Sequence, residues 1–440
     1  MAPRFVNRLA RAQKMMAEAT LDLLLIVNRE NLIYFTGVTQ IECLAVLIPQ
    51  VGEPCAVALW LDAGYVGKES GLPCYGYLFP KETLVTKIIE RIRAYGLSKP
   101  RIGFERYFVD FAVYDGLRRV FSQDDFIGAG ELLYRLRAIK EPQEIGKIRR
   151  AATAVCQGMD AAVKAVHPGV SELDVLAEAE YAMLKAGSWG SSFRPQVVSG
   201  ERALLAHPTA SSKKIAPGEA IVIHLGSTCE GYCAKMCRTV ALGDIPKKQE
   251  EIYDLLLKAQ EESIAALRPG ASSADVDAAA RKIIEAAGDG NSFLDTIGYG
   301  VGLRQSEFYP IIGKGRTEVI EAGMVVDLLL PTIYQKNIGG PRITDVVLVG
   351  EQKNDILTAY SRQMIKKSLW REKHCSWKRN SKRIFRSVKE IYLNALRGEW
   401  PRASSLGNFN YYSLFPSSQR GGWEGDSAEQ TESAGGRSVY

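Results

Sequence analysis

The chain has 440 residues and carries 56 Lys and Arg against 50 Asp and Glu, a formal net charge of +6. A hydrophobic fraction of 46% can build cores for two or three domains. The charged fraction of 24% and the mean hydropathy of -0.10 exclude a wholly disordered or membrane-embedded protein. Because no apolar run is long enough for a membrane span or a signal peptide, we expect a cytoplasmic protein with reduced thiols.

Residues 1–140 are predicted to form an α/β domain, because short apolar strands alternate with amphipathic helices. The expected helices are 5–17, 81–95 and 112–121, and the expected strands are 21–27, 43–48 and 101–104. The segment 136–144 is charged and contains a proline, which indicates a hinge. We expect a long helix to follow this hinge and to extend through Lys164.

Residues 141–357 form the second predicted domain, in which long helices alternate with strands bounded by Gly and Pro. The expected helices after the hinge helix are 171–186, 247–267 and 273–287, and the expected strands are 220–225, 233–242, 324–330 and 343–349. This order of elements predicts a mixed α and β domain.

Residues 358–440 differ from the body and are predicted to be a basic, Trp-rich tail. Residues 361–440 hold 15 Lys and Arg against 7 Asp and Glu, a net +8, so the rest of the chain is at -2. Apolar residues recur at helical spacing over 384–396, typical of a basic amphipathic helix for an acidic partner or surface. The alternative is an appendage that packs on the body or is disordered, and from 398 onward we expect disorder.

Four segments of the second domain carry a family likeness through their order and spacing: 224–243, 297–307, 321–334 and 339–349. With 136–152, they resemble the pita-bread superfamily of methionine aminopeptidase, prolidase, Xaa-Pro aminopeptidase and creatinase. The likeness covers about residues 5–350. It implies a creatinase/prolidase-type N-terminal α/β domain, then a pita-bread (α+β) domain, with the basic C-terminal extension outside it.

The superfamily's metallopeptidases hold two divalent ions with two Asp, one His and two Glu. The corresponding places in this chain hold His224, Lys235, Tyr299, Leu330 and Thr344. If the fourth place is counted from Gly323, it falls on Leu329 instead of Leu330. Hard divalent ions prefer oxygen-rich ligand sets, which these residues do not supply. The sequence therefore resembles the metal-free members, and we expect neither a metal nor another cofactor.

Lys235 is the most unusual of these substitutions, because the likeness directs it at the former metal pocket. A buried ammonium costs several kcal/mol unless it is paired. We therefore expect it to meet Asp327, Asp345 or an anionic substrate. The three thiols of 229, 233 and 237 have a spacing that could suggest a metal site, but we interpret them as packing residues on two joined strands.

His207 is the best candidate for an acid/base, because the likeness places it where creatinase has its catalytic His. A neutral imidazole can take a proton from water and return it to a leaving nitrogen. Glu307 would assist it. The alternatives are a loop His that only hydrogen-bonds its surroundings and a Glu307 paired with Arg304 or another base. The expected substrate-binding residues are His224, Lys235, Tyr299 and Arg342.

The sequence thus predicts a metal-independent hydrolase of a C–N bond in a small amino-acid-like substrate that carries a carboxylate. This is the creatinase or ectoine hydrolase type. Cys237 and Thr344 stand where creatinase has the carboxylates that bind the guanidinium of creatine, and the sequence of 303–310 departs from that of ectoine hydrolase. One alternative is a non-catalytic binding module, as the fold serves in a histone chaperone subunit. Another is an Xaa-Pro peptidase with an atypical site. The resemblance also implies a homodimer.

Overall fold

A computed structural model describes residues 4–42, 44–108, 110–335 and 339–369, which all lie in one of the chain's two compact units. The amphipathic helix and the disorder predicted for the tail lie outside the described residues.

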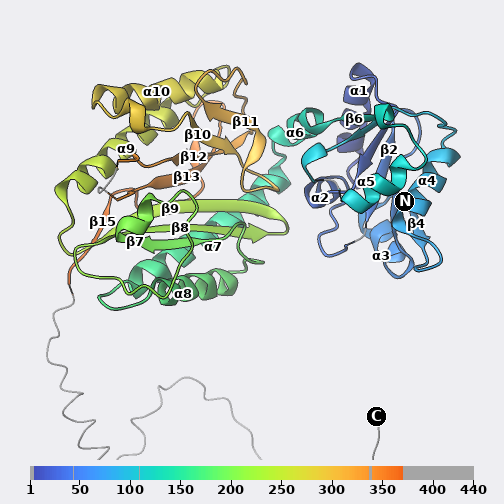
Figure 1. Cartoon of the computed structure of the whole chain (residues 1–440). Helices are drawn as coiled ribbons and strands as arrows, with labels where there is room; N and C mark the ends of the chain where they lie inside the picture. The colour runs from blue at the N-terminus through green and yellow to red at the C-terminus, as the bar shows by residue number, and fades with distance from the viewer. Residues whose placement is uncertain (1–3, 43, 109, 336–338, 370–440) are drawn as a thin grey trace, which may run out of the picture. The chain divides into compact units, whose positions relative to one another are not determined.

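The N-terminal part is built around a six-stranded sheet with the strand order β4-β3-β2-β1-β5-β6 (Figure 1). Its strands are β1 (Leu23–Ile26), β2 (Ala45–Pro49), β3 (Cys55–Leu59), β4 (Cys74–Tyr77), β5 (Ile102–Phe104) and β6 (Phe126–Gly128). Its helices are α1 (Val6–Glu18), α2 (Arg29–Thr36), α3 (Trp60–Ser70), α4 (Leu84–Ala94), α5 (Phe111–Arg118) and α6 (Gly130–Ala138), with single 3-10 turns at Arg106–Phe108 and Gln123–Asp125.

Strand β1 explains why this sheet forms where the sequence is most apolar. Its four residues are all buried, and successive side chains enter different cores: Leu24 and Ile26 one, Leu23 and Leu25 the other. Residues that alternate between two buried faces produce an uninterrupted apolar run rather than an alternating one. This confirms the α/β class expected for the first part of the chain.

The C-terminal part is built around a nine-stranded sheet with the order β11-β10-β12-β13-β9-β8-β7, to which β14 and β15 add. Its strands are β7 (Gln196–Ser199), β8 (Ala220–Cys229), β9 (Tyr232–Leu242), β10 (Thr296–Gly300), β11 (Glu307–Gly313), β12 (Val325–Leu330), β13 (Ile343–Leu348), β14 (Asp355–Ile356) and β15 (Ile365–Lys367). Its helices are α7 (Pro142–Ala165), α8 (Glu172–Lys185), α9 (Lys247–Ala266) and α10 (Ser273–Ala286), with 3-10 turns η3 (Gly200–Leu204) and η4 (Gly290–Ser292).

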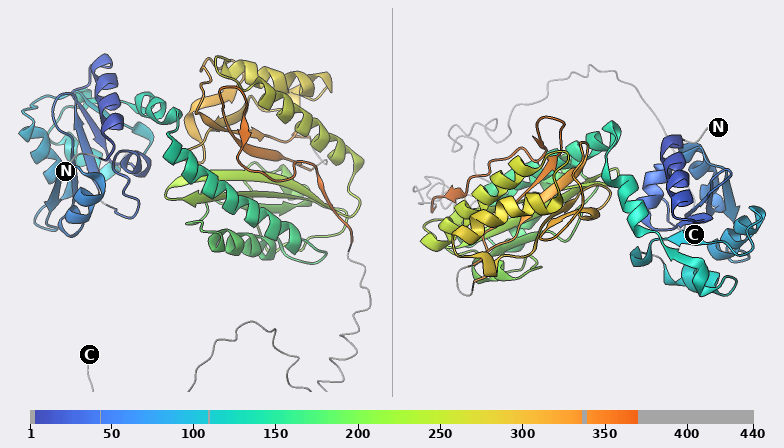
Figure 2. Two further views of the ribbon diagram at one scale, coloured as in Figure 1. Left: turned by 180° about the vertical axis from the view of Figure 1, so that it is seen from behind. Right: turned by 90° about the horizontal axis from the view of Figure 1, so that it is seen from above.

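The four long helices cover one face of this sheet (Figure 2). Val155 and Met159 of α7 lie in one core with Ile221 and Ile223 of β8. Because side chains alternate across a strand, His224, the residue after Ile223, points to the opposite face. That opposite face carries most of the residues expected in the functional site.

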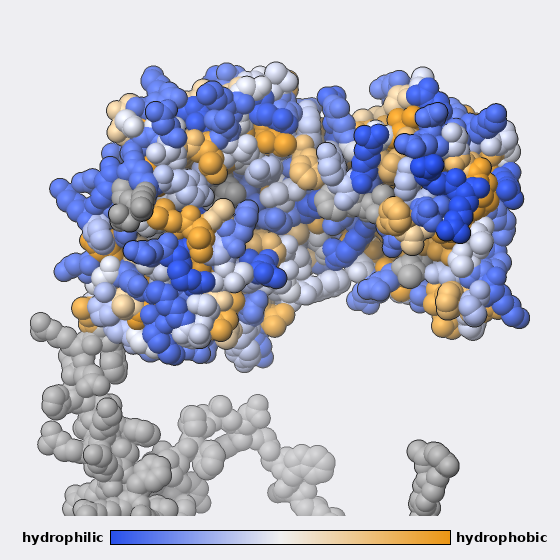
Figure 3. Space-filling view, in the orientation of Figure 1, coloured by the Kyte–Doolittle hydropathy of each residue, from blue (hydrophilic) through white to orange (hydrophobic). Residues whose placement is uncertain are grey.

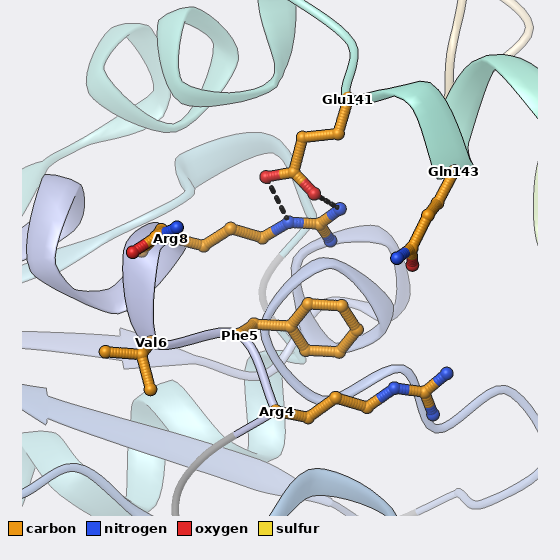
Figure 4. A pocket seen from close by; sticks show the side chains of 7 residues that line it. Arg4, Phe5, Val6, Arg8, Glu141 and Gln143 are labelled. Carbon is orange, nitrogen blue, oxygen red and sulfur yellow. Dashed lines mark hydrogen bonds and ion pairs between the residues drawn. The ribbon is translucent and has the colours of Figure 1, made fainter.

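A pocket beside α1 shows how the first helix is attached to α7 (Figure 4). The Arg8 guanidinium lies between the carboxylate of Glu141 and the ring of Phe5, as the close-up shows. It donates to Glu141 through Nε at 3.1 Å and Nη2 at 2.7 Å, and its centre lies 4.4 Å from the Phe5 ring centroid. Since Arg8 is buried, these paired contacts offset the loss of its hydration.

Strand β15 lies within the range expected for the tail, yet it pairs with the C-terminal sheet. Ile365 pairs with Val240 of β9 in a parallel register. Residues 358–369 therefore continue along the body before the described chain ends.

No helix of the described residues is both long and apolar enough to cross a membrane. On the face that Figure 3 shows, hydrophobic residues are interspersed with hydrophilic ones.

The helices and strands predicted for residues 1–357 are present, with ends shifted by a few residues. The sequence interpretation missed α2, α3, β7, β10 and β11 among others. Strand β10 shows why: its sequence TIGYG is rich in glycine, which is depleted in strands. Its glycines are required by close backbone approach, since a Cβ at Gly298 would lie 2.3 Å from the Asp327 carbonyl oxygen.

Replacing Gly226 of β8 by Ala should destabilise the protein, because its Cβ would lie 2.2 Å from Ser192 Oγ and 2.3 Å from the Phe193 ring. We expect a loss of about 1–3 kcal/mol in the free energy of unfolding, typical of overpacking. Gly146→Ala in α7 is the matched control, because nothing lies within 4 Å of its Cβ position. Helix propensity should make that variant about 0.5–1 kcal/mol more stable, and urea denaturation measures both.

Candidate functional site

The open face of the second sheet brings the expected site residues into two adjacent rows. One row crosses four strands through Gln196, His224, Cys237 and Thr344, which are consecutive cross-strand partners. Paired residues in a β-sheet point to the same face. His224, an expected substrate-binding residue, and Thr344 therefore share one row.

The next row on the same face contains Lys235, Asp327 and Tyr299. Lys235 pairs with Gly226, and Tyr299 pairs with Asp327. The Lys235 ammonium forms an ion pair with the Asp327 carboxylate and donates to Ser306 Oγ at 3.0 Å. The two side chains are only 1% and 0% exposed, so the charge of Lys235 is matched by the protein itself.

Asp327 is held from two sides. Its Oδ1 accepts the Tyr299 backbone N–H at 2.6 Å, while the other oxygen faces Lys235. Burial is the dominant influence and raises the pKa of Asp327 above its usual value, against the opposing effect of the ammonium. The pair is stable because each charge removes the cost of burying the other.

Asp345, the other carboxylate expected as a partner of Lys235, has a different role. It lies on the helix-covered face of β13, where it accepts from Arg238 Nη2 and from Thr358 Oγ1, both at 2.7 Å. Adjacent positions on a strand point to opposite faces, so Asp345 and Thr344 belong to different environments. The expectation that Asp345 could reach Lys235 is therefore wrong.

His224 is a buried imidazole with one ring nitrogen free. Its ring lies 4.7 Å from that of Phe193, and its Nε2 has no hydrogen-bond partner among the described residues. Burial, followed by the charges of Lys235 and Arg342, lowers the pKa of His224 well below its usual value. The ring is therefore neutral at physiological pH.

Tyr299 and Cys237 complete the two rows. Tyr299 is half-buried, and burial together with Asp327 raises the pKa of its phenol. Burial raises the pKa of Cys237 to about 12, so its thiol is not a ready nucleophile. Cys229, Cys233 and Cys237 are all buried on β8 and β9, and none of them forms a disulfide with another described residue.

Glu307 lies at the start of β11 and belongs to a buried ion-pair network. Its carboxylate pairs with Arg137 at the end of α6 and accepts the Arg304 backbone N–H at 3.3 Å. Burial alone would raise the pKa of Glu307, but Arg137 and Lys140 hold it below its usual value. Burial lowers the pKa of Lys140 itself to about 8.

The network continues into the N-terminal part, where the sequence analysis identified no site residue. The Arg304 side chain pairs with Glu30 at 3.1 Å and Glu105 at 3.3 Å. Asn31 donates to Glu105 at 2.7 Å and accepts from Arg137. The signal that could have revealed this network is the pair of bases in 136–140, since buried bases require carboxylates.

His207 lies at the exposed tip of the loop that follows η3. No hydrogen bond or ion pair links its ring to another described residue, so the structure does not join it to Glu307. The loop itself is held by Arg342, whose Nη2 donates to the carbonyls of Ala203 and Leu205, each at 2.7 Å. Arg342 therefore acts on the loop that carries His207.

Glu172 holds the same loop from the other side. This carboxylate is fully buried and accepts from the backbone N–H groups of Ser199 at 2.9 Å and Ser211 at 3.1 Å. Arg202 pairs with it and also donates to the Thr209 carbonyl at 2.7 Å. Both ends of the loop are thereby fixed, with His207 between them.

The donor chemistry of the open face does not suit divalent cations. Among the described residues, no group of three or more His, Cys, Asp and Glu side chains is arranged to hold a metal ion. The face instead offers a neutral imidazole, a hydroxyl, a thiol and an ion-paired ammonium.

Comparison with known proteins identifies both halves of the chain. Residues 146–351 match the model of metallopeptidase family M24, and residues 8–139 match the creatinase/prolidase N-terminal domain. The protein YkvY of Bacillus subtilis is 30% identical over 364 residues, covering 82% of this chain and 99% of that protein. The Xaa-Pro dipeptidase of Pyrococcus furiosus is 29% identical over 359 residues, which cover 82% of this chain and 99% of that protein.

Solved structures give the same result for the fold. An Xaa-Pro dipeptidase from Bacillus anthracis superimposes with a TM-score of 0.76 at 28% identity, covering 82% of this chain and 99% of that one. The N-terminal domain of the FACT complex subunit SPT16 from Cicer arietinum superimposes with a TM-score of 0.69 at 17% identity, covering 82% of this chain and 98% of that one. The latter likeness shows the fold alone.

Removing one partner of the buried pair should be costly, and removing both should not. We expect Lys235→Met to lose about 3–5 kcal/mol of unfolding free energy, because it leaves the Asp327 carboxylate buried and unpaired. The double variant Lys235→Met with Asp327→Leu should recover most of this loss. Lys247→Met, on an exposed side chain, is the control; equal losses in the single and double variants would contradict the pairing.

Glu307 should contribute to acid sensitivity. Because its folded pKa is depressed, its stabilisation is present above the unfolded pKa of about 4.3 and is lost as pH falls through the folded pKa. We expect Glu307→Gln to be less stable than wild type at pH 7 and to show a shallower loss of stability below pH of about 4. Urea midpoints across pH measure this, with the exposed Glu18→Gln as control; parallel pH profiles would contradict it.

Proposed function

Since this chain belongs to metallopeptidase family M24, in the branch with a creatinase/prolidase N-terminal domain, we propose that it is a metal-independent hydrolase. Its relatives include Xaa-Pro dipeptidases, which supports hydrolysis as the reaction class. We propose that the scissile bond is a C–N bond in a small amino-acid-like substrate with a carboxylate, as in creatinase and ectoine hydrolase.

The ion pair between Lys235 and Asp327 is the observation that carries this proposal. Lys235 stands where the family resemblance places an acidic metal ligand, and its ammonium lies buried against a carboxylate. A fixed positive charge repels divalent cations, and the remaining side chains of that face supply too few oxygen donors. The residues therefore do not fit the two-metal centre that the family name implies.

In the proposed reaction, His207 takes a proton from water while the oxygen adds to the carbon of the C–N bond. The same imidazole then returns the proton to the leaving nitrogen. His224, Tyr299 and Arg342 would contact the substrate or position its loop. Since Glu307 is already paired with Arg137, we assign it to holding the site together rather than to attacking the substrate.

A non-catalytic binding module is the second candidate. It is favoured by the enclosure of Lys235 and Asp327. It is also favoured by the exposed His207, whose ring has no hydrogen-bond or ion-pair partner among the described residues, so no acid/base pair is assembled. The third candidate is an Xaa-Pro peptidase with an atypical site, favoured by the dipeptidases among the relatives.

Three further features remain proposals. We propose domain limits near residues 140 and 357, a homodimeric assembly and a cytoplasmic location. We also propose that the tail of 358–440 contacts an acidic partner or surface through its net positive segment. Light scattering of the full chain beside a form ending at residue 369 would test the assembly and the tail's part in it.

The central test combines a metal measurement with a substrate screen on the purified full chain. Metal content is measured by mass spectrometry, and turnover is screened with Xaa-Pro dipeptides, acyl amino acids, ureas and cyclic amidines. We expect turnover of a carboxylate-bearing substrate that chelators do not reduce. We expect His207→Ala to lower kcat by about 10²–10⁴-fold.

The matched control is His167→Ala, a second exposed histidine outside the candidate site. Stoichiometric Mn, Co or Zn that turnover requires would overturn metal independence. An unchanged kcat in His207→Ala would overturn the acid/base assignment. Absence of turnover on the whole panel would favour the binding module.

A further inference from the structure

The open face of the second sheet contains several deeply buried polar atoms that have no hydrogen-bond partner in the described chain. They are Gln196 Oε1, His224 Nε2, Arg342 Nε and Thr344 Oγ1. The four side chains are between 0% and 8% exposed. Buried polar groups are nearly always hydrogen-bonded, so such a concentration requires an explanation.

These unpaired atoms occupy one place in the fold. Gln196, His224 and Thr344 belong to the same cross-strand row, with Cys237 between the last two. Arg342 comes immediately before the first residue of β13, and its guanidinium lies on the open face, because its Nη2 donates to the carbonyl of Ala203, which packs there. Its backbone is fixed by Thr239 Oγ1, which accepts its N–H at 2.9 Å and donates to its carbonyl at 3.0 Å.

The part of the open face around these unpaired atoms carries a positive charge. Lys235 is neutralised by Asp327, but Arg342 forms no ion pair with any carboxylate of the described residues. Within the described part of the chain, its guanidinium donates only to the neutral carbonyls of Ala203 and Leu205. A buried guanidinium without a counter-ion favours the binding of an anion.

We propose that this row is a binding site for the carboxylate of a small monoanionic ligand. Arg342 Nε and Thr344 Oγ1 donate to the carboxylate oxygens, and His224 Nε2 binds beside them. Gln196 Oε1 accepts from an N–H of the same ligand. The place where metal-dependent relatives would be expected to hold cations thus accepts the opposite charge.

The loop over the row supplies an entrance. Ala203 of η3 packs with Val198, Val222 and Cys237 on the open face, so the loop covers the row. The tip of the same loop is exposed at Leu205 and His207. Arg342 donates to the carbonyls of Ala203 and Leu205 in this loop and also belongs to the proposed site, so we expect ligand binding to be coupled to the position of the loop.

This inference deepens the proposed function, on which it rests for the view that the bound carboxylate is part of a substrate. Its test measures binding without turnover, so the two can fail separately. The probe is N-acetylglycine, which has one carboxylate and one N–H, and the comparison is its neutral amide, N-acetylglycinamide. Binding to the full chain is measured by calorimetry and by the thermal midpoint, in buffer free of chloride.

We expect N-acetylglycine to bind and to raise the midpoint, as a ligand selective for the native state does. It should bind at least about tenfold more tightly than the amide, because the charge-assisted bonds are lost in the latter. Added chloride should not abolish this preference. Equal binding of acid and amide, no binding of either, or a chloride ion that fully replaces the acid would overturn the proposal.

Thr344→Val is the decisive variant, because it keeps the shape of the side chain and removes only an unpaired hydroxyl. Without ligand, Thr344→Val should be as stable as the wild type, and its affinity for N-acetylglycine should be about tenfold lower. The control is Ser273→Ala at the start of α10, another buried hydroxyl without a partner but outside the row. It should bind as wild type does; a fall of the same size in both variants would overturn the assignment.

Discussion

The ion pair between Lys235 and Asp327 is the interaction on which the character of the open sheet face depends. A charge buried alone would cost several kcal/mol, so each member requires the other. The pair links β9 to β12 across β13, and its ammonium also binds Ser306 between β10 and β11. One salt bridge therefore connects both halves of the sheet.

A second buried network connects the N-terminal part of the chain to this sheet. Arg137 pairs with Glu307, while Arg304 pairs with Glu30 and Glu105. Such a network gives directional contacts that apolar packing alone does not, and a hydrogen-bonded network of this kind specifies one arrangement. It also explains why Glu307 is unavailable for chemistry while remaining beside the site.

Much of the fold could be predicted, because long helices and apolar strands carry their periodicity in the chain itself. Strand β10 could not be predicted, because glycine has a low strand propensity. Its glycines are there because the backbones of Asp327 and the neighbouring strands leave no room for a Cβ. The prediction that Lys235 meets Asp327, Asp345 or an anionic substrate followed from its charge and from the buried position that the family resemblance implied. The choice of Asp327 over Asp345 depended on which face of β12 and β13 each residue occupies.

The sequence by itself determined the family and the two-part architecture, because the order and spacing of the motifs are present in the chain itself. Only the tertiary structure decided that Arg342 hydrogen-bonds the loop that carries His207 and that four polar atoms without hydrogen-bond partners lie together on the open face of the sheet. The reason is physical: hydrogen-bond partners and burial arise between strands far apart in sequence. The initial +6 therefore says less about the site than Arg342, a single buried charge without a carboxylate among the described residues.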